Sequence, residues 1–253
     1  MKKLVSNIFA ISILFAGQIN SQQISVSSPE WLVDMFFSKS SFLEKASYYS
    51  GEMLSEINEP TIGEELNGKG EVAFRQIKAS NDESVFAVEV KLENKIIDFY
   101  SYLKKEGDQW KITAVRRFLL PQFIYTVRDS LSNLKSLSSN DSTFYLSLKL
   151  FTLNDSDLIK YFNSNLNKFQ ELVASFNNSL SDEINKGLVS VACNAIYSDK
   201  KYPGCIFIQI LKFETMEIGF IQAANSVLLP EISVEKYIYI DEVSPGWFIY
   251  RAM

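Results

Sequence analysis

Hydrophobic positions recur at helical spacing between residues 28 and 58. Ser28 followed by Pro29 predicts a helix start, because serine is a favoured N-cap and proline fits the first helical position. Ser41 with Glu44 three residues later has the form of a capping box, which predicts a second helix. In both segments the apolar residues are three or four positions apart: Leu32, Met35 and Phe36, then Leu43, Ala46, Tyr49, Met53 and Ile57.

The period of the pattern changes from residue 70 onward, where apolar and polar positions alternate. Such alternation is typical of strands that bury one face. The alternating segments are 72–77, 86–92, 95–105 and 110–114. Because short turns join them, we predict that residues 70–118 form a four-stranded antiparallel meander.

The second half of the chain mixes both patterns. Residues 121–138 have the apolar spacing of an amphipathic helix, and residues 138–142 are polar and loop-like. Alternation predicts a strand over residues 143–151, and Asn154 is the expected cap of a long helix that follows. Residues 188–197 fit either a strand or a short buried helix. Four more strands are predicted, at 205–213, 217–224, 237–240 and 247–250.

These patterns predict an α+β protein of two small domains, each with helices packed on an antiparallel meander sheet. We place the first domain at residues 22–120, a helix and linker at 121–140, and the second domain at 141–253. The chain of 253 residues is long enough for two small domains.

The first 21 residues have the layout of a secretory signal peptide. Lys2 and Lys3 precede an apolar, uncharged run from Leu4 to Ala16, and a mostly small or polar stretch follows. We expect cleavage after Ser21; the alternative is an uncleaved N-terminal anchor, although the run is shorter than the roughly 20 residues that span a membrane. The short leader and the Ile-, Lys-, Asn- and Ser-rich composition predict a protein exported to the periplasm or the exterior of a Gram-negative bacterium, without a membrane span after cleavage.

Composition excludes several function classes. The chain contains no histidine, which excludes Ser-His-Asp catalysis and histidine-ligated zinc or haem. Its formal net charge is −5, and no cluster of lysine and arginine supplies a footprint for nucleic acid. Phosphate-binding and calcium-binding loop motifs are absent from the sequence. We therefore expect no cofactor, no metal and no nucleic-acid partner.

The chain contains two cysteines, Cys193 and Cys205, separated by a turn-like segment with Pro203-Gly204. If the flanking segments pair as antiparallel strands, the two thiols can form a disulfide in an oxidising compartment. The alternative is a pair of buried free thiols, because both residues have apolar neighbours.

The helical segment from Pro29 to Ile57 and the hairpin from Tyr100 to Ile112 carry a resemblance to a known family. The hairpin contains Gly-Asp-Gln-Trp-Lys-Ile, similar to a Gly-x-Trp-Lys-Ile ending with one extra residue. Residues 29–120 thereby resemble the cone-shaped α+β fold of the nuclear transport factor 2-like superfamily; cystatin-like meanders share this ending. The resemblance implies a fold and no activity, because that fold hosts enzymes and binding modules. The C-terminal half resembles no family that we recognise.

Asp98, Tyr100 and Tyr102 are the candidate catalytic residues. They share one face of the third predicted strand, because strand side chains alternate. A buried carboxyl beside tyrosine hydroxyls has the elements of a proton carrier and an oxyanion donor. The alternative is an exposed polar face, with Phe99 and Leu103 on the core side.

Three functional hypotheses remain open. The leading one is an exported, non-enzymatic protein that binds an unidentified small molecule or protein partner, because no nucleophile motif or paired-carboxylate spacing stands out. The first alternative is a small-molecule isomerase or hydrolase that uses Asp98 with Tyr100 and Tyr102 in a cone-shaped pocket. The second is an acidic inhibitor or immunity-type protein that covers a basic target.

Overall fold

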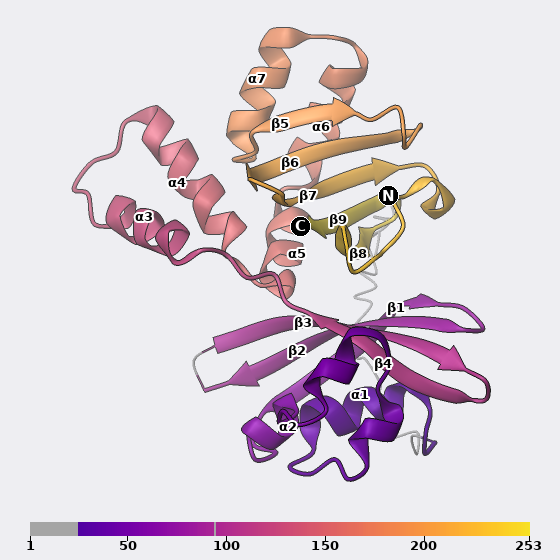
Figure 1. Ribbon diagram of the computed structural model, residues 1–253. Helices are drawn as coiled ribbons and strands as arrows, with labels where there is room; N and C mark the ends of the chain where they lie inside the picture. The colour runs from indigo at the N-terminus through magenta and orange to yellow at the C-terminus, as the bar shows by residue number, and fades with distance from the viewer. Residues whose placement is uncertain (1–24, 94) are drawn as a thin grey trace, which may run out of the picture.

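Helices and two antiparallel sheets make up the protein, as Figure 1 shows for the computed structural model, which describes residues 25–93 and 95–253. The predicted α+β class is confirmed. One sheet has the strand order β1-β2-β3-β4 and the other has the order β5-β6-β7-β9-β8. We call residues 25–120 the N-terminal half and residues 121–253 the C-terminal half.

The helices are α1 (Pro29–Ser38), α2 (Ile62–Glu65), α3 (Gln122–Ser132), α4 (Ser139–Phe151), α5 (Asp155–Ser164), α6 (Leu166–Asn177) and α7 (Ser181–Ser190). The strands are β1 (Glu71–Ala79), β2 (Glu83–Leu92), β3 (Lys95–Glu106), β4 (Gln109–Arg116), β5 (Ala195–Ser198), β6 (Cys205–Phe213), β7 (Met216–Ala223), β8 (Tyr237–Ser244) and β9 (Trp247–Ala252). Short 3-10 helices cover Lys45–Tyr48, Gly51–Glu56 and Ser226–Leu228.

The four-stranded sheet agrees with the meander predicted from alternation. Each of its strands pairs antiparallel with the next one along the chain. Ser28 caps α1 as expected, because its hydroxyl accepts from the Trp31 N–H at 3.1 Å. One face of this sheet packs on α1 and the short helices, where Phe37 and Phe99 meet with ring centroids 5.4 Å apart.

The helix predicted to begin at Ser41 is absent. Glu44 has a left-handed backbone with φ 56°, which ends regular helix geometry there, and two 3-10 helices follow instead. Gly51 is also left-handed, at φ +56°, and a Cβ there would lie 3.1 Å from the Thr113 carbonyl oxygen. The capping box occurs later, at Thr61 and Glu64, and it starts α2.

The other face of the four-stranded sheet packs against the C-terminal half (Figure 1). Tyr100 on β3 stacks on Tyr239 on β8, with ring centroids 4.9 Å apart. Small side chains at Ala87 and Ala114 lie in the same apolar core, which continues into α5 and the five-stranded sheet. The central strands β2 and β3 are therefore buried on both faces, by α1 on one side and by the C-terminal half on the other.

Aromatic side chains form the core between the helices of the C-terminal half and the five-stranded sheet. Phe162 on α5 lies 4.8 Å from Phe220 on β7 and 5.3 Å from Trp247 on β9, between ring centroids. Phe169 on α6 joins the same cluster, 5.1 Å from Phe220. The predicted packing of helices on an antiparallel sheet is thus found here, although β9 inserts between β7 and β8 and the sheet is not a simple meander.

Three sequence-based assignments in the C-terminal half need correction. The strand predicted at 143–151 is helix α4, which Ser138 caps by accepting from the Asp141 N–H at 3.1 Å. The long helix predicted after Asn154 divides at Asn165 into α5 and α6. The ambiguous segment 188–197 contains the end of α7 and the start of β5.

Cys193 and Cys205 are free and buried, so the expected disulfide is not formed in this structure. The strand register explains why. The Asn194 N–H donates to the Gln209 carbonyl, whereas Cys205 begins the same strand four residues earlier. The two thiols therefore lie toward opposite ends of the β5–β6 pair, and each donates to a different backbone carbonyl, Cys193 to Val191 and Cys205 to Leu228.

The expected signal peptide, residues 1–21, lies outside the described residues. Within residues 25–93 and 95–253 we find no helix with the length and apolar character needed to cross a membrane.

Candidate ligand site between the two sheets

The β3 strand places Asp98, Tyr100 and Tyr102 on the face of the four-stranded sheet that meets the C-terminal half. Tyr100 is fully buried and Tyr102 is 6% exposed. Phe99 and Leu103 point to the opposite face, into the core beneath α1. The three candidate residues do share one face, but this face is not the exposed polar surface of the alternative interpretation.

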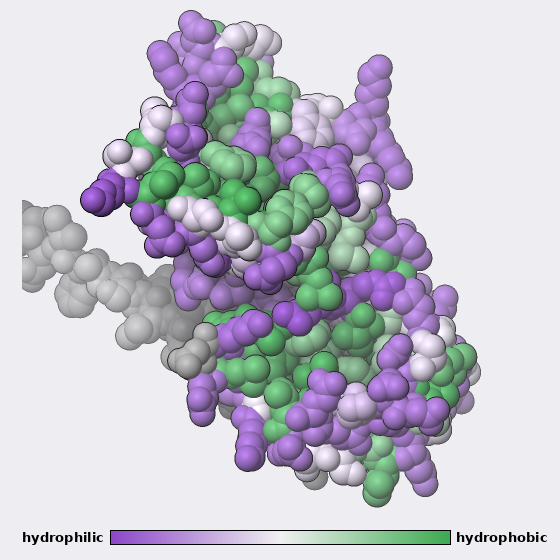
Figure 2. All heavy atoms as spheres, turned by 60° about the vertical axis from the view of Figure 1, so that its left-hand side comes forward, coloured by the Kyte–Doolittle hydropathy of each residue, from purple (hydrophilic) through white to green (hydrophobic). Residues whose placement is uncertain are grey.

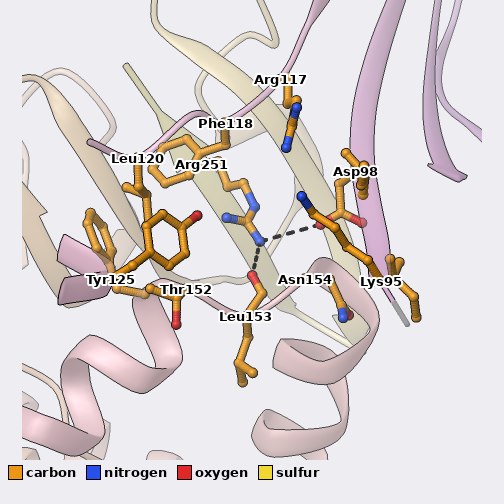
Figure 3. Close-up of a pocket in the computed structure, with 13 residues that line it drawn as sticks. Lys95, Asp98, Arg117, Phe118, Leu120, Tyr125, Thr152, Leu153, Asn154 and Arg251 are labelled. Atoms are coloured by element: carbon orange, nitrogen blue, oxygen red, sulfur yellow. Dashed lines mark hydrogen bonds and ion pairs between the residues drawn. The ribbon is translucent and has the colours of Figure 1, made fainter. Parts of the chain in front are cut away.

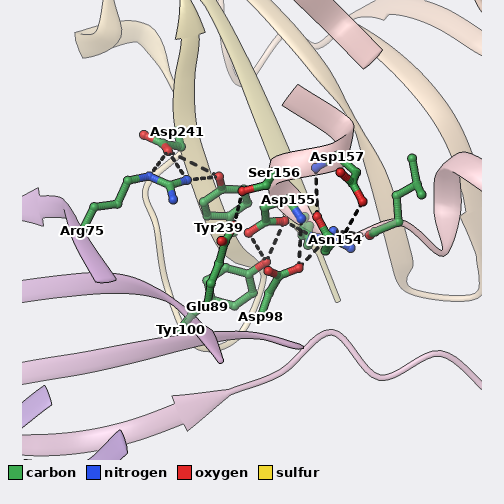
Figure 4. Close-up of polar contacts among 12 residues, drawn as sticks. Arg75, Glu89, Asp98, Tyr100, Asn154, Asp155, Ser156, Asp157, Tyr239 and Asp241 are labelled. Carbon is green, nitrogen blue, oxygen red and sulfur yellow. Dashed lines mark hydrogen bonds and ion pairs between the residues drawn. The ribbon is translucent and has the colours of Figure 1, made fainter. Parts of the chain in front are cut away.

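Both tyrosine hydroxyls hold the two halves together. Tyr100 donates to Asp155 Oδ2 at 2.9 Å, and Tyr102 donates to the Ile238 carbonyl at 2.8 Å (Figure 4 shows the first contact). A phenol has a single hydrogen to donate, and each of these hydrogens already has a protein acceptor. The predicted role of these hydroxyls as oxyanion donors therefore conflicts with the contacts that they make.

Asp98 lies at the edge of this buried contact. Its Oδ2 accepts from the backbone N–H of Asp155 at 2.9 Å and lies 3.8 Å from Arg251 Nη2, whereas its Oδ1 is buried without a hydrogen-bond partner in the described part of the chain. Burial raises the pKa of Asp98 to about 7; the negative charge of Asp155 adds to this effect and Arg251 opposes it. The carboxyl is thus poised to exchange a proton near neutral pH.

Asp155 and Arg251 form a buried ion pair that the sequence did not reveal. Arg251 Nε donates to Asp155 Oδ1 at 2.7 Å, and Arg251 Nη2 donates to the Leu153 carbonyl at 2.8 Å. The side chains of both partners are 3% exposed. From sequence, Asp155 looked like a first-turn helix acid; the available signal was Arg251, a charged residue within the apolar strand Trp247–Ala252.

A second polar link lies beside the first one. Arg75 on β1 donates to Asp241 on β8 at 2.7 Å and to the Tyr239 hydroxyl at 2.6 Å (Figure 4). Ser156 on α5 donates to Glu89 on β2. These contacts join residues that are far apart in sequence, so separate polar links lie side by side between the two sheets and the N-terminus of α5.

A pocket of about 230 Å³ opens next to Asp98, at the junction of the two halves (Figure 3). Its polar lining combines one carboxyl, Asp98, with three cations, Lys95, Arg117 and Arg251. Arg251 is committed to the buried carboxylates, whereas neither Lys95 nor Arg117 forms an ion pair with any described residue. Aromatic and aliphatic walls complete the pocket: Ile96, Ile97, Phe118, Leu120, Tyr125, Phe151 and Leu153, with Thr152 and Asn154.

The arrangement suits a small anion better than a metal ion. Cations without a carboxylate partner can donate charge-assisted hydrogen bonds to an anion. The apolar walls beside them limit the access of water. Among residues 25–93 and 95–253 no group of three or more carboxylate, thiol or imidazole side chains lies close enough to hold a metal. The volume of about 230 Å³ lies below the roughly 300–1,000 Å³ of pockets for drug-sized ligands, so the pocket suits a small ligand.

In comparisons with known proteins, neither a family model nor a curated protein nor a solved structure matches this chain. The resemblance of residues 29–120 to the nuclear transport factor 2-like superfamily therefore remains a prediction from sequence.

Proposed function

We propose that this protein is an exported binding protein for a small anion, such as a short carboxylate or a phosphate, held in the pocket between its two halves. One observation carries the proposal: Lys95 and Arg117 converge on that pocket without a carboxylate partner in the described part of the chain. This local excess of positive charge contrasts with the formal net charge of −5 for the whole chain. Export rests on the sequence of residues 1–21.

The position of the pocket gives a reason for the two-part architecture. Lys95 and Arg117 come from β3 and from the segment after β4, whereas Asn154 and Arg251 come from the C-terminal half. A bound anion would therefore contact both halves, and its binding energy would add to the polar links that already join them.

Isothermal titration calorimetry with inorganic phosphate and with succinate tests the proposal. We expect saturable binding of at least one of them, with a stoichiometry of one per chain. The double substitution Lys95→Gln/Arg117→Gln should weaken that binding about a hundredfold or more, because each lost charge-assisted hydrogen bond costs about 1.5–3 kcal/mol. The matched control is Lys200→Gln/Lys201→Gln, which removes two exposed lysines from the β5–β6 connection.

Two results would contradict the proposal. One is the absence of saturable binding of either anion at concentrations up to about 10 mM, a weak-binding limit. The other is an equal loss of affinity in both double variants, because overall charge rather than the pocket would then explain the binding.

A second candidate function, proton transfer on an anionic substrate, is favoured by Asp98. This carboxyl lines the pocket, and a pKa of about 7 suits a general acid or base at neutral pH. We rank it below binding because the hydroxyls of Tyr100 and Tyr102 already donate to protein acceptors. The variant Asp98→Asn separates the two functions: loss of anion turnover with retained anion binding supports catalysis, and binding without turnover in the unaltered protein excludes it.

A further inference from the structure

A second pocket, of about 490 Å³, lies in the N-terminal half and shares no lining residue with the pocket between the sheets. The segment between α1 and α2 forms one side of it, and the end of β4 forms the other. Gly51 fixes this segment against β4, because its left-handed backbone lets it approach the Thr113 carbonyl closely.

The rim of this pocket is strongly acidic. It contains four glutamates, Glu52, Glu56, Glu59 and Glu65, against one cation, Arg116. Arg116 is occupied, because its guanidinium donates to Glu52 at 2.6 Å and to a backbone carbonyl of the C-terminal half. The carboxylates of Glu59 and Glu65 make no hydrogen bond or ion pair with any described residue, and both side chains are exposed.

The floor of the pocket is apolar and contains one polar atom without a partner. Phe36, Tyr49 and Met53 line it and are 6%, 2% and 5% exposed. The Tyr49 hydroxyl has no hydrogen-bond partner in residues 25–93 or 95–253, although the side chain is almost fully buried. Burial and the nearby glutamates Glu64 and Glu56 raise the pKa of Tyr49, so the hydroxyl stays protonated. The hydroxyl is not one of the fully enclosed side-chain oxygens of the described residues, so it can bond to a ligand group that enters the pocket.

We propose that this second pocket binds an organic ammonium ion with an aliphatic stem. The ammonium group would lie between Glu59 and Glu65, and the stem would cover Phe36 and Met53. The Tyr49 hydroxyl would bond to a polar group of the ligand. A metal ion fits less well, because aromatic and thioether side chains form the floor and hard cations prefer a shell of oxygen ligands. A purely apolar ligand would leave the glutamates and the hydroxyl unsatisfied.

Calorimetric titration of the full chain with hexylamine and with spermidine tests this inference. We expect saturable binding of at least one amine, at one per chain, and no binding of hexanol or hexanoate. Hexanol keeps the stem without the charge, and hexanoate reverses the charge. The double variant Glu59→Gln/Glu65→Gln should lower the amine affinity about a hundredfold, as expected for two lost charged hydrogen bonds. Tyr49→Phe should lower the affinity for spermidine, which has further polar groups, about threefold and should leave the affinity for hexylamine almost unchanged.

The matched control is Glu71→Gln/Asp108→Asn, which removes two exposed carboxylates outside the pocket. Its amine affinity should equal that of the unaltered protein. Equal weakening in the two double variants would overturn the inference, and so would the absence of saturable binding of both amines up to about 10 mM. Far-ultraviolet circular dichroism confirms that each variant is folded; the exposed positions of Glu59 and Glu65 make this the expected result.

Figure 2 shows hydrophobic side chains gathered in two areas of one face, separated by a band of polar side chains. The proposed amine site does not depend on either of these surface areas, because Phe36, Tyr49 and Met53 form the apolar floor inside the pocket.

Discussion

Replacement of Asp98 by asparagine should make the protein more stable at pH 8 and should leave its stability almost unchanged at acidic pH. Asparagine has nearly the same shape as the protonated carboxyl and retains an oxygen that can accept from the Asp155 N–H. The variant therefore resembles the protonated protein at every pH. Any pH-dependent difference between the two proteins reports the free energy of ionising Asp98 in its buried position.

The magnitude follows from the pKa of Asp98, which rises from its usual 3.8 to about 7 because of burial and the charge of Asp155. Between these values the folded state binds more protons than the unfolded state, so the stability of the unaltered protein falls as pH rises from about 4 to about 8. At 1.36 kcal/mol per pKa unit the whole loss is about 4 kcal/mol. Because local relaxation and water entry relieve part of the cost of a buried charge, we expect a step of about 2–4 kcal/mol.

Urea unfolding at pH 4.5, 6, 7 and 8 measures the difference in free energy of unfolding between Asp98→Asn and the unaltered protein. These values cover the interval of about pH 4 to 8 in which ionisation of Asp98 changes stability. Above about pH 5.5, where ordinary carboxylates are ionised, no other side-chain type normally titrates in this interval, because the chain contains no histidine. The control Asp108→Asn alters an exposed carboxylate in the β3–β4 turn and should show no step. A difference between Asp98→Asn and the unaltered protein that stays constant with pH would refute the reasoning, as would a relative gain in stability of the unaltered protein as pH rises.

Three further variants or measurements test the contacts between and within the halves. Arg251→Met should destabilise the protein by about 3–5 kcal/mol in urea unfolding, because it leaves the buried charge of Asp155 without its counter-ion; a loss below about 1 kcal/mol, the size typical of an exposed pair, would argue against burial of the pair. Tyr102→Phe should cost about 1–2 kcal/mol, since a β8 carbonyl loses its donor, and unchanged stability would contradict that contact. Cys193 and Cys205 should react slowly with a thiol reagent in the folded protein, because burial raises the pKa of both thiols; two free thiols should appear after unfolding without reductant, and none would mean that the pair is oxidised.

The strands of the N-terminal half could be predicted because each has at least one face with regular alternation. The second buried face of β2 could not be predicted from alternation. Ala87 is small and Glu89 is polar, and Ala87 becomes buried and Glu89 partly buried only where the C-terminal half covers the strand. The error at residues 143–151 has a related cause. Leucines at 146, 148 and 150 alternate as in a strand, yet Leu148 and Phe151 also lie on one helical face, and the Ser138 cap starts the helix.

The candidate site could be predicted only in part. Asp98, Tyr100 and Tyr102 follow from local alternation along one strand. Asp155 and Arg251, which lie beside these residues in the structure, could not be predicted in this way. They are 96 positions apart in sequence, and no local pattern connects them. The separation of Cys193 from Cys205 in this structure could not be predicted for a similar reason: the register of the β5–β6 pair depends on where α7 ends, and the apolar run around Cys193 left that end open.

The position of β9 between β7 and β8 determines when the C-terminal half can complete its folding. β7 pairs with β9 from Glu217↔Ala252 to Gln222↔Trp247, so until residues 247–252 leave the ribosome or a translocation channel, β7 presents an open backbone edge. The same residues carry Arg251, so a nascent chain that lacks them would have to bury Asp155 without a positive charge. Both penalties delay compaction until the whole segment has emerged. Such a chain remains incompletely folded for longer, which exposes the apolar β7 strand to chaperones before β9 covers its edge.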